Sequence, residues 1–389
     1  MALRVSHLSS LLILALCCSC DFETIFGTES EDAGFFRLDS GIIPTKDAGS
    51  ITDTDSGVID NPDQNCPWPP TPPSCVKPAV DSPVFSIPNN NITPSLNAMI
   101  HCADNYIRAA FYQTSWESVV EAFATRLSND EDLRVELVVD DSACPRVNGQ
   151  LMCPWSKIEA DPRVTIIDDS RSKLMHHKFM IVDGGEVWVG SANMTTDSLC
   201  NDSNDAIVIN EAAVVGAYEA EFERLFVRQE FGPIQPSPPV ISGPYTVYFG
   251  PVSPLSQPAP WFTALVEKID LAETSVEFMI FAFTRLEVSD ALTRASARGV
   301  KVRGLVSNLY ANDAPALALV EAGIEIRKGR IHSKMMVVDK KTVITGSANW
   351  SRNAWQNNEN SLWIDDEGIT SHYVSEFDRV FDLSTVVTP

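Results

Sequence analysis

Two segments of this chain carry the same residue types at the same spacing. Each has the order His, any residue, Lys, four residues, Asp, six residues, and then Gly-Ser-Ala-Asn. A lone strand histidine is usually a core residue, but two copies of six specified positions are not expected by chance. The candidate site residues are His176, Lys178, Asp183, Ser191 and Asn193 in the first copy, and His332, Lys334, Asp339, Ser347 and Asn349 in the second.

These residue types suit the cleavage of a phosphodiester. The bond is slow to hydrolyse because its negative charge repels nucleophiles. Lys and Asn side chains can stabilise the charge that the non-bridging oxygens gain in the transition state. Imidazole can act as a nucleophile or as a proton donor near neutral pH. One copy supplies one His, whereas in-line displacement needs groups on two opposite sides of the phosphorus. The doubled motif therefore predicts two halves that meet at one reaction centre.

Each motif is predicted to lie on a β-hairpin. The residues between Lys and Asp, 179–182 and 335–338, are apolar and typical of strands. Because side chains alternate along a strand, His and Lys, two positions apart, are expected to point to the same face. Asp, at the end of the strand, is expected to point to the opposite face. A turn at 184–185 or 340–341 then lets the next strand return with Ser and Asn.

The elements around the two motifs follow the same order, which indicates an internal duplication. Strands that alternate with helices predict a mainly parallel α/β sheet in each half. In the first half we expect strands at 106–111 and 133–139 around a helix at 116–127; in the second we expect strands at 275–283 and 301–306, a helix at 288–298, and a further helix from Asp313 to Gly323.

Composition divides the rest of the chain. The formal net charge is −23, and residues 21–82 alone hold twelve acidic and three basic residues. That segment is rich in Asp, Ser, Thr, Gly and Pro without sustained periodicity, so we expect a disordered tether. A Pro-rich linker at 233–243 separates a first half, residues 83–232, from a second, residues 244–389. The acidic body gives no long-range attraction to polyanions, which counts modestly against nucleic acid as the substrate.

Residues 1–20 are typical of an export signal, with a positive residue, a short apolar run and then Cys20. The pattern resembles the lipidation site of bacterial lipoproteins. We therefore expect a lipid anchor at Cys20 on the periplasmic or surface side of the cell envelope, with plain cleavage and secretion as the alternative. Six cysteines lie beyond this signal, and an even number favours disulfides in an exported chain. Equal spacing suggests the pairs Cys66–Cys75 and Cys144–Cys153, which leaves Cys102 with Cys200.

The doubled motif resembles the signature of the phospholipase D superfamily, over roughly residues 85–385. The resemblance implies an α/β fold class, with two duplicated α/β sandwich halves packed about a pseudo-twofold axis and one shared active site. The protein would be active as a pseudo-dimeric monomer. The resemblance also implies that His176 forms a phosphohistidine and that His332 protonates the leaving group. Lys178, Lys334, Asn193 and Asn349 would hold the phosphate, and Asp183 and Asp339 would orient the site. It implies no cofactor and no metal, and the sequence offers no separate cluster of metal-ligand residues.

The two halves diverge just beyond the motifs. Glu359 follows the second motif and resembles an acidic position that pairs with a catalytic His in relatives; as part of a surface turn it would need no function. The matching acid of the first half is either Asp205 or missing. Glu359, Ser191 and Ser347 are therefore candidate substrate-binding residues.

The expected activity is that of a phosphoric diester hydrolase of phospholipase D type, acting on phospholipid head groups at a membrane surface. The acidic body, the predicted anchor and the aromatic residues Trp350 and Trp355 favour lipid, although these tryptophans could equally lie in the core. The alternative is a metal-independent, non-specific endonuclease that binds nucleic acid through the basic cluster Arg327–Arg330. A binding protein without catalysis would not need intact His, Lys and Asn in both copies.

Overall fold

The computed structural model describes residues 66–388, apart from residue 73 and residues 87–91. The predicted export signal with Cys20, and the predicted tether as far as residue 65, lie outside the described residues. None of the helices in the described part of the chain is both long and apolar enough to cross a membrane.

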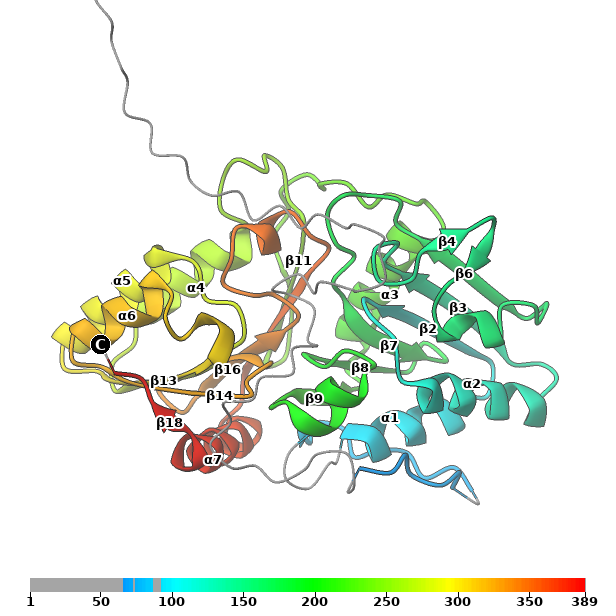
Figure 1. Cartoon of the computed structure of the whole chain (residues 1–389), viewed down its shortest axis with the longest axis horizontal. Coiled ribbons are helices and arrows are strands. Elements are labelled where there is room, and N and C mark those ends of the chain that lie inside the picture. The colour runs from blue at the N-terminus through cyan, green and yellow to red at the C-terminus, as the bar shows by residue number, and fades with distance from the viewer. Residues whose placement is uncertain (1–65, 73, 87–91, 389) are drawn as a thin grey trace, which may run out of the picture. The chain divides into compact units, whose positions relative to one another are not determined.

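The first half is built on a seven-stranded sheet with the strand order β1-β9-β8-β7-β2-β3-β6 (Figure 1). Strands β2, β3 and β6 run parallel to one another, whereas β7, β8 and β9 are antiparallel. The strands are β1 (Val84–Phe85), β2 (Tyr106–Phe111), β3 (Arg134–Val139), β6 (Val164–Asp168), β7 (Lys178–Val182), β8 (Glu186–Gly190) and β9 (Asp205–Ile209), with β4 (Arg146–Val147) and β5 (Gln150–Leu151) as a separate pair. The helices of this half are α1 (Ile92–His101), α2 (Glu117–Asn129) and α3 (Ala212–Phe226).

The second half repeats this order in a nine-stranded sheet, β10-β11-β17-β16-β15-β12-β13-β14-β18. Its strands are β10 (Val240–Ser242), β11 (Tyr245–Phe249), β12 (Ser275–Ile280), β13 (Lys301–Ser307), β14 (Glu325–Gly329), β15 (Lys334–Val338), β16 (Thr342–Gly346), β17 (Asn360–Asp365) and β18 (Thr385–Val386). Its helices are α4 (Pro260–Asp270), α5 (Leu286–Ala297), α6 (Ala314–Glu321) and α7 (Glu367–Leu383).

The shared strand order β9-β8-β7-β2-β3-β6 and β17-β16-β15-β12-β13-β14 confirms the predicted duplication and the α/β fold class. The prediction of mainly parallel sheets is wrong, because each sheet is mixed. The parallel βαβ unit supplies only three strands of each sheet. The motif hairpin is antiparallel because its short turn can connect only antiparallel neighbours, and the strand that follows it after a longer loop is also antiparallel.

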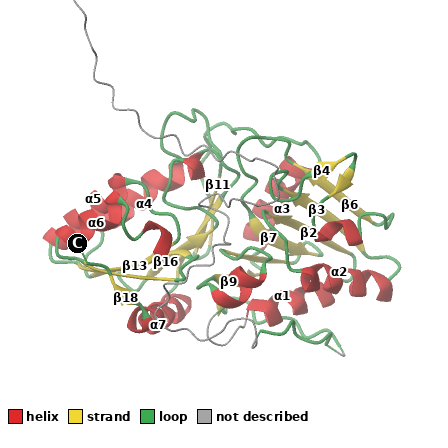
Figure 2. Ribbon diagram, in the orientation of Figure 1, coloured by secondary structure: helices red, strands yellow, loops and turns green. Residues whose placement is uncertain are grey.

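Helices flank both sheets, and the apolar side chains form three main clusters (Figure 2). One cluster contains α1 and α2 with one face of the first sheet, and another contains α4, α5 and α6 with one face of the second. The third cluster takes side chains from both sheets, such as Val187 and Val343, together with Tyr218 of α3 and Phe377 of α7. Each large apolar side chain buried there contributes roughly 1.5–3 kcal/mol. The two halves therefore share a central core.

The structure corrects two of the three predicted disulfides. It pairs Cys66 with Cys200 and Cys75 with Cys102, and it confirms Cys144–Cys153. Residues 67–73 contain five prolines, and proline-rich chain favours an extended conformation. Nine residues of such chain span up to about 28 Å. A disulfide needs Cα atoms about 4.4–6.8 Å apart. Equal spacing was therefore a poor guide to pairing.

The C-terminal part of the expected tether packs on the fold. Besides the two disulfides of this segment, Trp68 makes an edge-to-face contact with Trp116, with ring centroids 5.3 Å apart. Asp81 accepts a hydrogen bond from the Tyr245 hydroxyl at 2.5 Å, which joins the segment to the second half. The prediction of a tether over 21–82 is thus wrong for the described residues between 66 and 82, because cysteine and tryptophan anchors outweigh the polar composition.

A disulfide map tests this connectivity. In a digest under non-reducing conditions, with free thiols blocked beforehand, we expect mass spectrometry to find the Cys66 peptide linked to the Cys200 peptide. The Cys144–Cys153 link serves as the internal control, since spacing and structure agree on it. A peptide that links Cys66 to Cys75 would contradict the fold of this segment.

Candidate active site

The two motif hairpins bring one His–Lys pair from each half to the start of a central strand. Strands β7 and β15 begin at Lys178 and Lys334, and each His lies two residues earlier. All four side chains are buried, with at most 3% of each residue exposed. Each lysine Nζ donates to the carbonyl of its own His, at 2.6 Å for Lys178 and 2.5 Å for Lys334. Two buried ammonium groups concentrate positive charge in a region where its field is weakly screened.

Each His is held by a side chain from the other half. His176 Nδ1 lies 2.9 Å from Glu359 Oε2, and His332 Nδ1 lies 2.9 Å from Asn204 Oδ1. The backbone amides of the two histidines are also hydrogen-bonded to the opposite half. The amide of His176 donates to the carbonyl of Asn358 at 3.0 Å, and the amide of His332 donates to the carbonyl of Ser203 at 3.0 Å. Each histidine is therefore positioned by the loop after the opposite motif.

The sheet register shows which residues of these two loops are equivalent. Gly190 pairs with Ala206, and Gly346 pairs with Ser361, so Asn204 occupies the position of Glu359. The structure places Glu359 against a motif His, as the sequence resemblance implied. Asp205 is not the matching acid, because its carboxylate contacts Ser191 Oγ at 3.0 Å and the Thr345 hydroxyl. The residue that matches Glu359 is therefore Asn204, whose side chain is an amide.

Sequence comparison of the two halves missed Asn204 for a specific reason. Asn204 follows Asn193 by eleven positions, but Glu359 follows Asn349 by ten. The first loop contains a π-helical turn, Asp197–Asn201, where the second has a 3₁₀ turn, Asn353–Trp355. A π-turn adds one residue to a helical turn. Counting ten positions from Asn193 therefore leads to Ser203 instead of Asn204, and Asp205 was considered only because it is an acid nearby.

The electrostatics tie the four motif side chains into one site. Burial lowers the pKa of His176 well below its usual value, and the charges of Lys178 and Lys334 lower it further. Burial, the same two lysines and His176 lower the pKa of His332. Each His thus responds to the lysine of both halves, and both are neutral near pH 7 when no anion is bound. Burial also raises the pKa of Glu359 to about 7.

The Gly-Ser-Ala-Asn segments close the site from the next strand. A Cβ at Gly190 would lie 2.1 Å from the carbonyl oxygen of Asp205, and one at Gly346 would lie 2.5 Å from that of Asn360. Only glycine permits this approach. The hydroxyl of Ser191 donates to Asn204 Oδ1 at 2.8 Å, and that of Ser347 accepts from the amide of Asn360 at 3.0 Å. Both serines therefore contact the loops that hold the histidines.

The two asparagines of the motifs are buried at equivalent positions, but their side chains differ in hydrogen bonding. Asn349 Oδ1 accepts a hydrogen bond from the amide of Ala282 at 3.2 Å. Asn193 Oδ1 is buried and has no hydrogen-bond partner among the described residues. An amide oxygen left in this state costs free energy unless a ligand or water satisfies it. The Asn193 side chain is thus the more available of the two for a bound group.

The structure does not bring Asp183 and Asp339 into this cluster. They lie at the far ends of β7 and β15, seven residues from His176 and His332, which is about 23 Å of extended chain. Both have positive φ angles, 51° and 54°, at the hairpin bend. Their carboxylates accept backbone hydrogen bonds from the first residue of β2 or β12 and the two residues before it: Asp104, Asn105 and Tyr106 for Asp183, and Glu273, Thr274 and Ser275 for Asp339. They anchor the hairpins rather than line the reaction centre.

Two tryptophans and two arginines that were considered as indicators of the substrate have structural roles. Trp350 and Trp355 are core residues, 3% and 4% exposed, in contact with Phe283 and Phe262. In the basic cluster Arg327–Arg330, the first arginine pairs with Glu325, and the last pairs with Asp197 and Asp202 of the first half. The tryptophans no longer favour a lipid surface, and the two arginines are not free for nucleic acid.

Three carboxylates form a cluster of metal-ligand residues, whereas no separate cluster of this kind was expected from the sequence. Asp140, Asp141 and Asp169 follow the parallel strands β3 and β6 and present oxygens within 4.8 Å of one another. Burial raises the pKa of Asp140 to about 6 and that of Asp169 to about 8. Asp140 Oδ2 accepts from the amide of Met175 at 2.8 Å, so this cluster also fixes the residue before His176. The cluster was not visible in the sequence because Asp169 comes 28 positions after Asp141.

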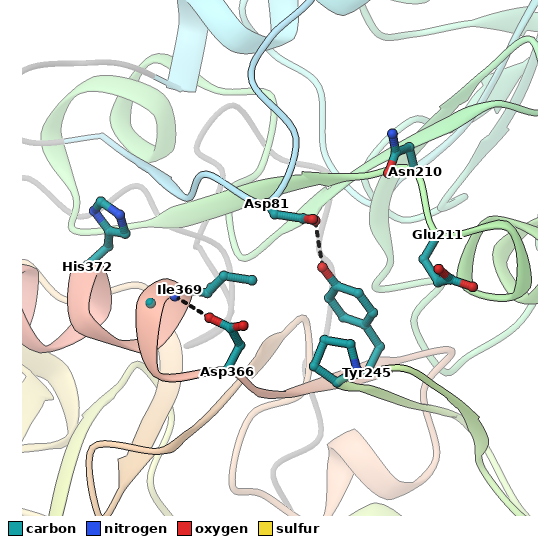
Figure 3. A pocket seen from close by; sticks show the side chains of 9 residues that line it. Asp81, Asn210, Glu211, Tyr245, Asp366, Ile369 and His372 are labelled. Carbon is teal, nitrogen blue, oxygen red and sulfur yellow. Dashed lines mark hydrogen bonds between the residues drawn. The ribbon is translucent and has the colours of Figure 1, made fainter.

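A polar pocket lies away from the motif residues (Figure 3). It is formed where β9 ends, where β11 begins and where α7 begins, with Asp81, Glu211, Asp366 and His372 in its wall. Tyr245 donates to Asp81, and Asp366 caps α7 by accepting from the amide of Ile369 at 2.8 Å. No motif residue lines this pocket, so its side chains can serve as controls for changes in the motif cluster.

The chain matches a family model described as "Cardiolipin synthase, PLD-like domain" over residues 96–226 and 265–381. These two stretches correspond to the two halves of the fold. Together they cover more than half of the chain.

Among curated proteins, the chain is 36% identical over 125 residues to the mitochondrial cardiolipin hydrolase of Canis lupus familiaris, covering 30% of this chain and 49% of that protein. It is 33% identical over 120 residues to the phospholipase D of Rickettsia prowazekii (strain Madrid E), covering 29% of this chain and 58% of that protein. The chain thus spans about half the length of the curated relatives it matches. Among solved structures, the phosphatidylserine synthase of Haemophilus influenzae Rd KW20 is similar in fold, with a TM-score of 0.60 at 12% identity, covering 79% of this chain and 88% of that one.

Asp183 provides a stability test of its anchoring role. Asp183→Ala removes the acceptor of three backbone N–H groups, so we expect the free energy of unfolding to fall by about 1–3 kcal/mol. Urea unfolding followed by circular dichroism would measure this loss. Asp104→Ala, an exposed neighbour whose backbone but not side chain takes part, is the matched control. Equal stability of the Asp183 variant and the wild type would contradict the role.

Proposed function

The chain belongs to the phospholipase D superfamily, and we propose that it hydrolyses phosphodiester bonds through a covalent phosphohistidine intermediate. The observation that carries this proposal is the pair of buried histidines, each held by the opposite half and flanked by a lysine. One side of a phosphorus atom can then face a nucleophile and the other an acid. This arrangement suits in-line displacement.

The first step would use both histidines. The Nε2 lone pair of His176 attacks phosphorus, and the bond from phosphorus to the leaving oxygen breaks. His332 Nε2 gives its proton to that oxygen. Burial, together with repulsion from Lys334 and Lys178, lowers the pKa of His332. The negative charge of a bound phosphodiester offsets that repulsion and so favours the protonated form of His332.

The second step would restore the enzyme. Water attacks the phosphohistidine, the N–P bond to His176 breaks, and His332 Nε2 takes the water proton. The two lysines would stabilise the charge on the non-bridging oxygens in both steps. Asn349 and Asn193, whose amide oxygen has no partner in the described part of the chain, would supply further contacts to the phosphate.

We propose a phospholipid as the substrate, cleaved at its head-group phosphodiester on a membrane surface. Three observations support lipid over nucleic acid: the net charge of −23, the ion pairs that engage Arg327 and Arg330, and the similarity to a cardiolipin hydrolase and a phospholipase D. A non-specific endonuclease would need a cationic groove for the backbone. Export and a lipid anchor at Cys20 would place the enzyme at such a surface.

Replacement of the histidines tests the shared site. We expect His176→Ala to abolish turnover and His332→Ala to lower it by about 10²–10⁴-fold on a substrate with an alcohol leaving group. Head-group release from phosphatidylcholine would report it, with the melting temperature as a check on folding. His372→Ala, in the separate pocket, is the matched control and should keep wild-type activity. Normal turnover in either motif variant would rule out a joint reaction centre.

A direct comparison of substrates tests the lipid assignment. The full chain would be offered vesicles of phosphatidylglycerol and cardiolipin in one assay and supercoiled plasmid DNA in another, with His176→Ala as the blank in both. We expect head-group release without nicking of the plasmid. Nicking that His176→Ala abolishes, without release of lipid head groups, would instead support the endonuclease.

A further inference from the structure

The small hairpin of β4 and β5 has an apolar outer face, although it lies at the protein surface. Val147 is the register partner of Gln150, and the amide of Met152 donates to the carbonyl of Pro145 at 2.8 Å. Because side chains alternate along a strand, these four residues share one face of the hairpin. Val147 is 51% exposed and Met152 is 60% exposed, and Pro145 is exposed beside them. Two large apolar side chains and a proline therefore face solvent together.

The inner face of the hairpin fixes it to the first half. Leu151 is buried in the apolar cluster that contains α1 and α2. The guanidinium of Arg146 pairs with Asp168, at the end of β6, and with Glu159. The disulfide Cys144–Cys153 joins the two ends of the hairpin. The apolar outer face is thus held outward by several contacts, and binding through it needs little further ordering of the chain.

The hairpin follows the edge of the first sheet at which the candidate site lies. Strand β3 ends at Val139, and β7 begins at Lys178. Since β2 is parallel to β3 and antiparallel to β7, the end of β3 and the start of β7 lie at the same edge. Only β2 separates these strands, which corresponds to about 10 Å. Asp140, at the base of the hairpin, accepts from the amide of Met175 at 2.8 Å, next to His176.

The described part of the chain also begins at this edge. Strand β8 is antiparallel to β7, so the π-helical turn that follows β8 lies on the side where β7 begins. Cys66 is disulfide-bonded to Cys200 in that turn. Residues 21–65 link Cys66 to the proposed anchor at Cys20, and a chain of this length spans at most about 150 Å. Such a link would keep the body near a membrane without selecting the face that meets it.

Charge and chemistry indicate which partner fits the outer face. Residues 147–152 contain no charged side chain, whereas the net charge of the whole chain is −23. An anionic membrane surface repels an acidic protein, so an uncharged apolar face is the part that can approach closely. Apolar area that leaves water stabilises the contact. The phosphodiester of a phospholipid lies just outside its acyl chains, so the edge that carries His176 must face the membrane during turnover.

We infer that the outer face of the β4–β5 hairpin, formed by Pro145, Val147 and Met152, is a membrane contact. It inserts among the head groups of a phospholipid surface and turns the edge with the reaction centre towards the substrate. The inference rests on the lipid substrate of the proposed function.

Tryptophan reporters test the contact directly. Val147→Trp and Met152→Trp would each be made in the full chain and mixed with phosphatidylcholine vesicles that carry bromine on the acyl chains, because bromine quenches indole fluorescence only at short range. We expect each variant to lose a larger fraction of its fluorescence than the wild type does. Leu271→Trp is the matched control, since Leu271 is 75% exposed and precedes β12 at the edge opposite Lys334. It should be quenched no more than the wild type.

Turnover tests whether the contact serves catalysis. The double variant Val147→Thr/Met152→Gln keeps the size of both side chains and removes much of their apolar character. Its substrates are phosphatidylcholine in vesicles and monomeric dihexanoylphosphatidylcholine, and every protein carries Cys20→Ser so that no acyl anchor masks the loss. We expect the ratio of vesicle turnover to monomer turnover to fall by about tenfold. Leu271→Gln is the control and should keep the wild-type ratio.

The outcomes separate the inference from the function on which it rests. Quenching of both hairpin variants no greater than that of the wild type, or an unchanged ratio in the folded double variant, would overturn the inference. Equal losses on both substrates would also overturn it, because they would assign the hairpin a structural role alone. A wild-type protein that cleaves neither substrate would contradict the proposed function, whereas quenching of the hairpin variants would still support the membrane contact.

Discussion

His176 and His332 are each hydrogen-bonded by a side chain from the opposite half of the chain, Glu359 and Asn204. The backbone amides of both histidines are bonded across the same boundary. Neither half therefore contains a complete site, and the site exists only while the two halves stay docked. The central apolar cluster, to which both sheets contribute, keeps them docked. In this fold, the candidate site takes residues from both halves.

The rest of each half supports that exchange of partners. Gly190 and Gly346 let the motif strand approach the next strand closely enough for the following loop to reach across. Asp183 and Asp339 fix the hairpins at their far ends, and Asp140 holds the segment before His176. Burying two lysines beside two histidines is costly without bound anions. A scaffold with several independent anchors can maintain such a site, and a phosphate group would relieve its positive charge.

The sequence was informative where the physical rules are local. Alternation predicted the motif hairpins, and repeated residue types predicted the duplication. The pairing of Glu359 with a motif His was implied by the family resemblance. Pairings between distant segments were not accessible in this way. Asn204 was hidden by one extra residue in a π-helical turn, and the disulfides of Cys66 and Cys75 depend on where a proline-rich segment packs. Asp140 and Asp169 meet only because their parallel strands are neighbours.

The covalent intermediate tests the central claim most directly. The full chain would be mixed with a phosphodiester, quenched within milliseconds, digested at alkaline pH, at which phosphohistidine survives, and mapped by mass spectrometry. Two halves that form one reaction centre with distinct roles predict a phosphoryl adduct on the peptide that contains His176 and none on the peptide that contains His332. An adduct on His332, or equal adducts on both, would contradict this account.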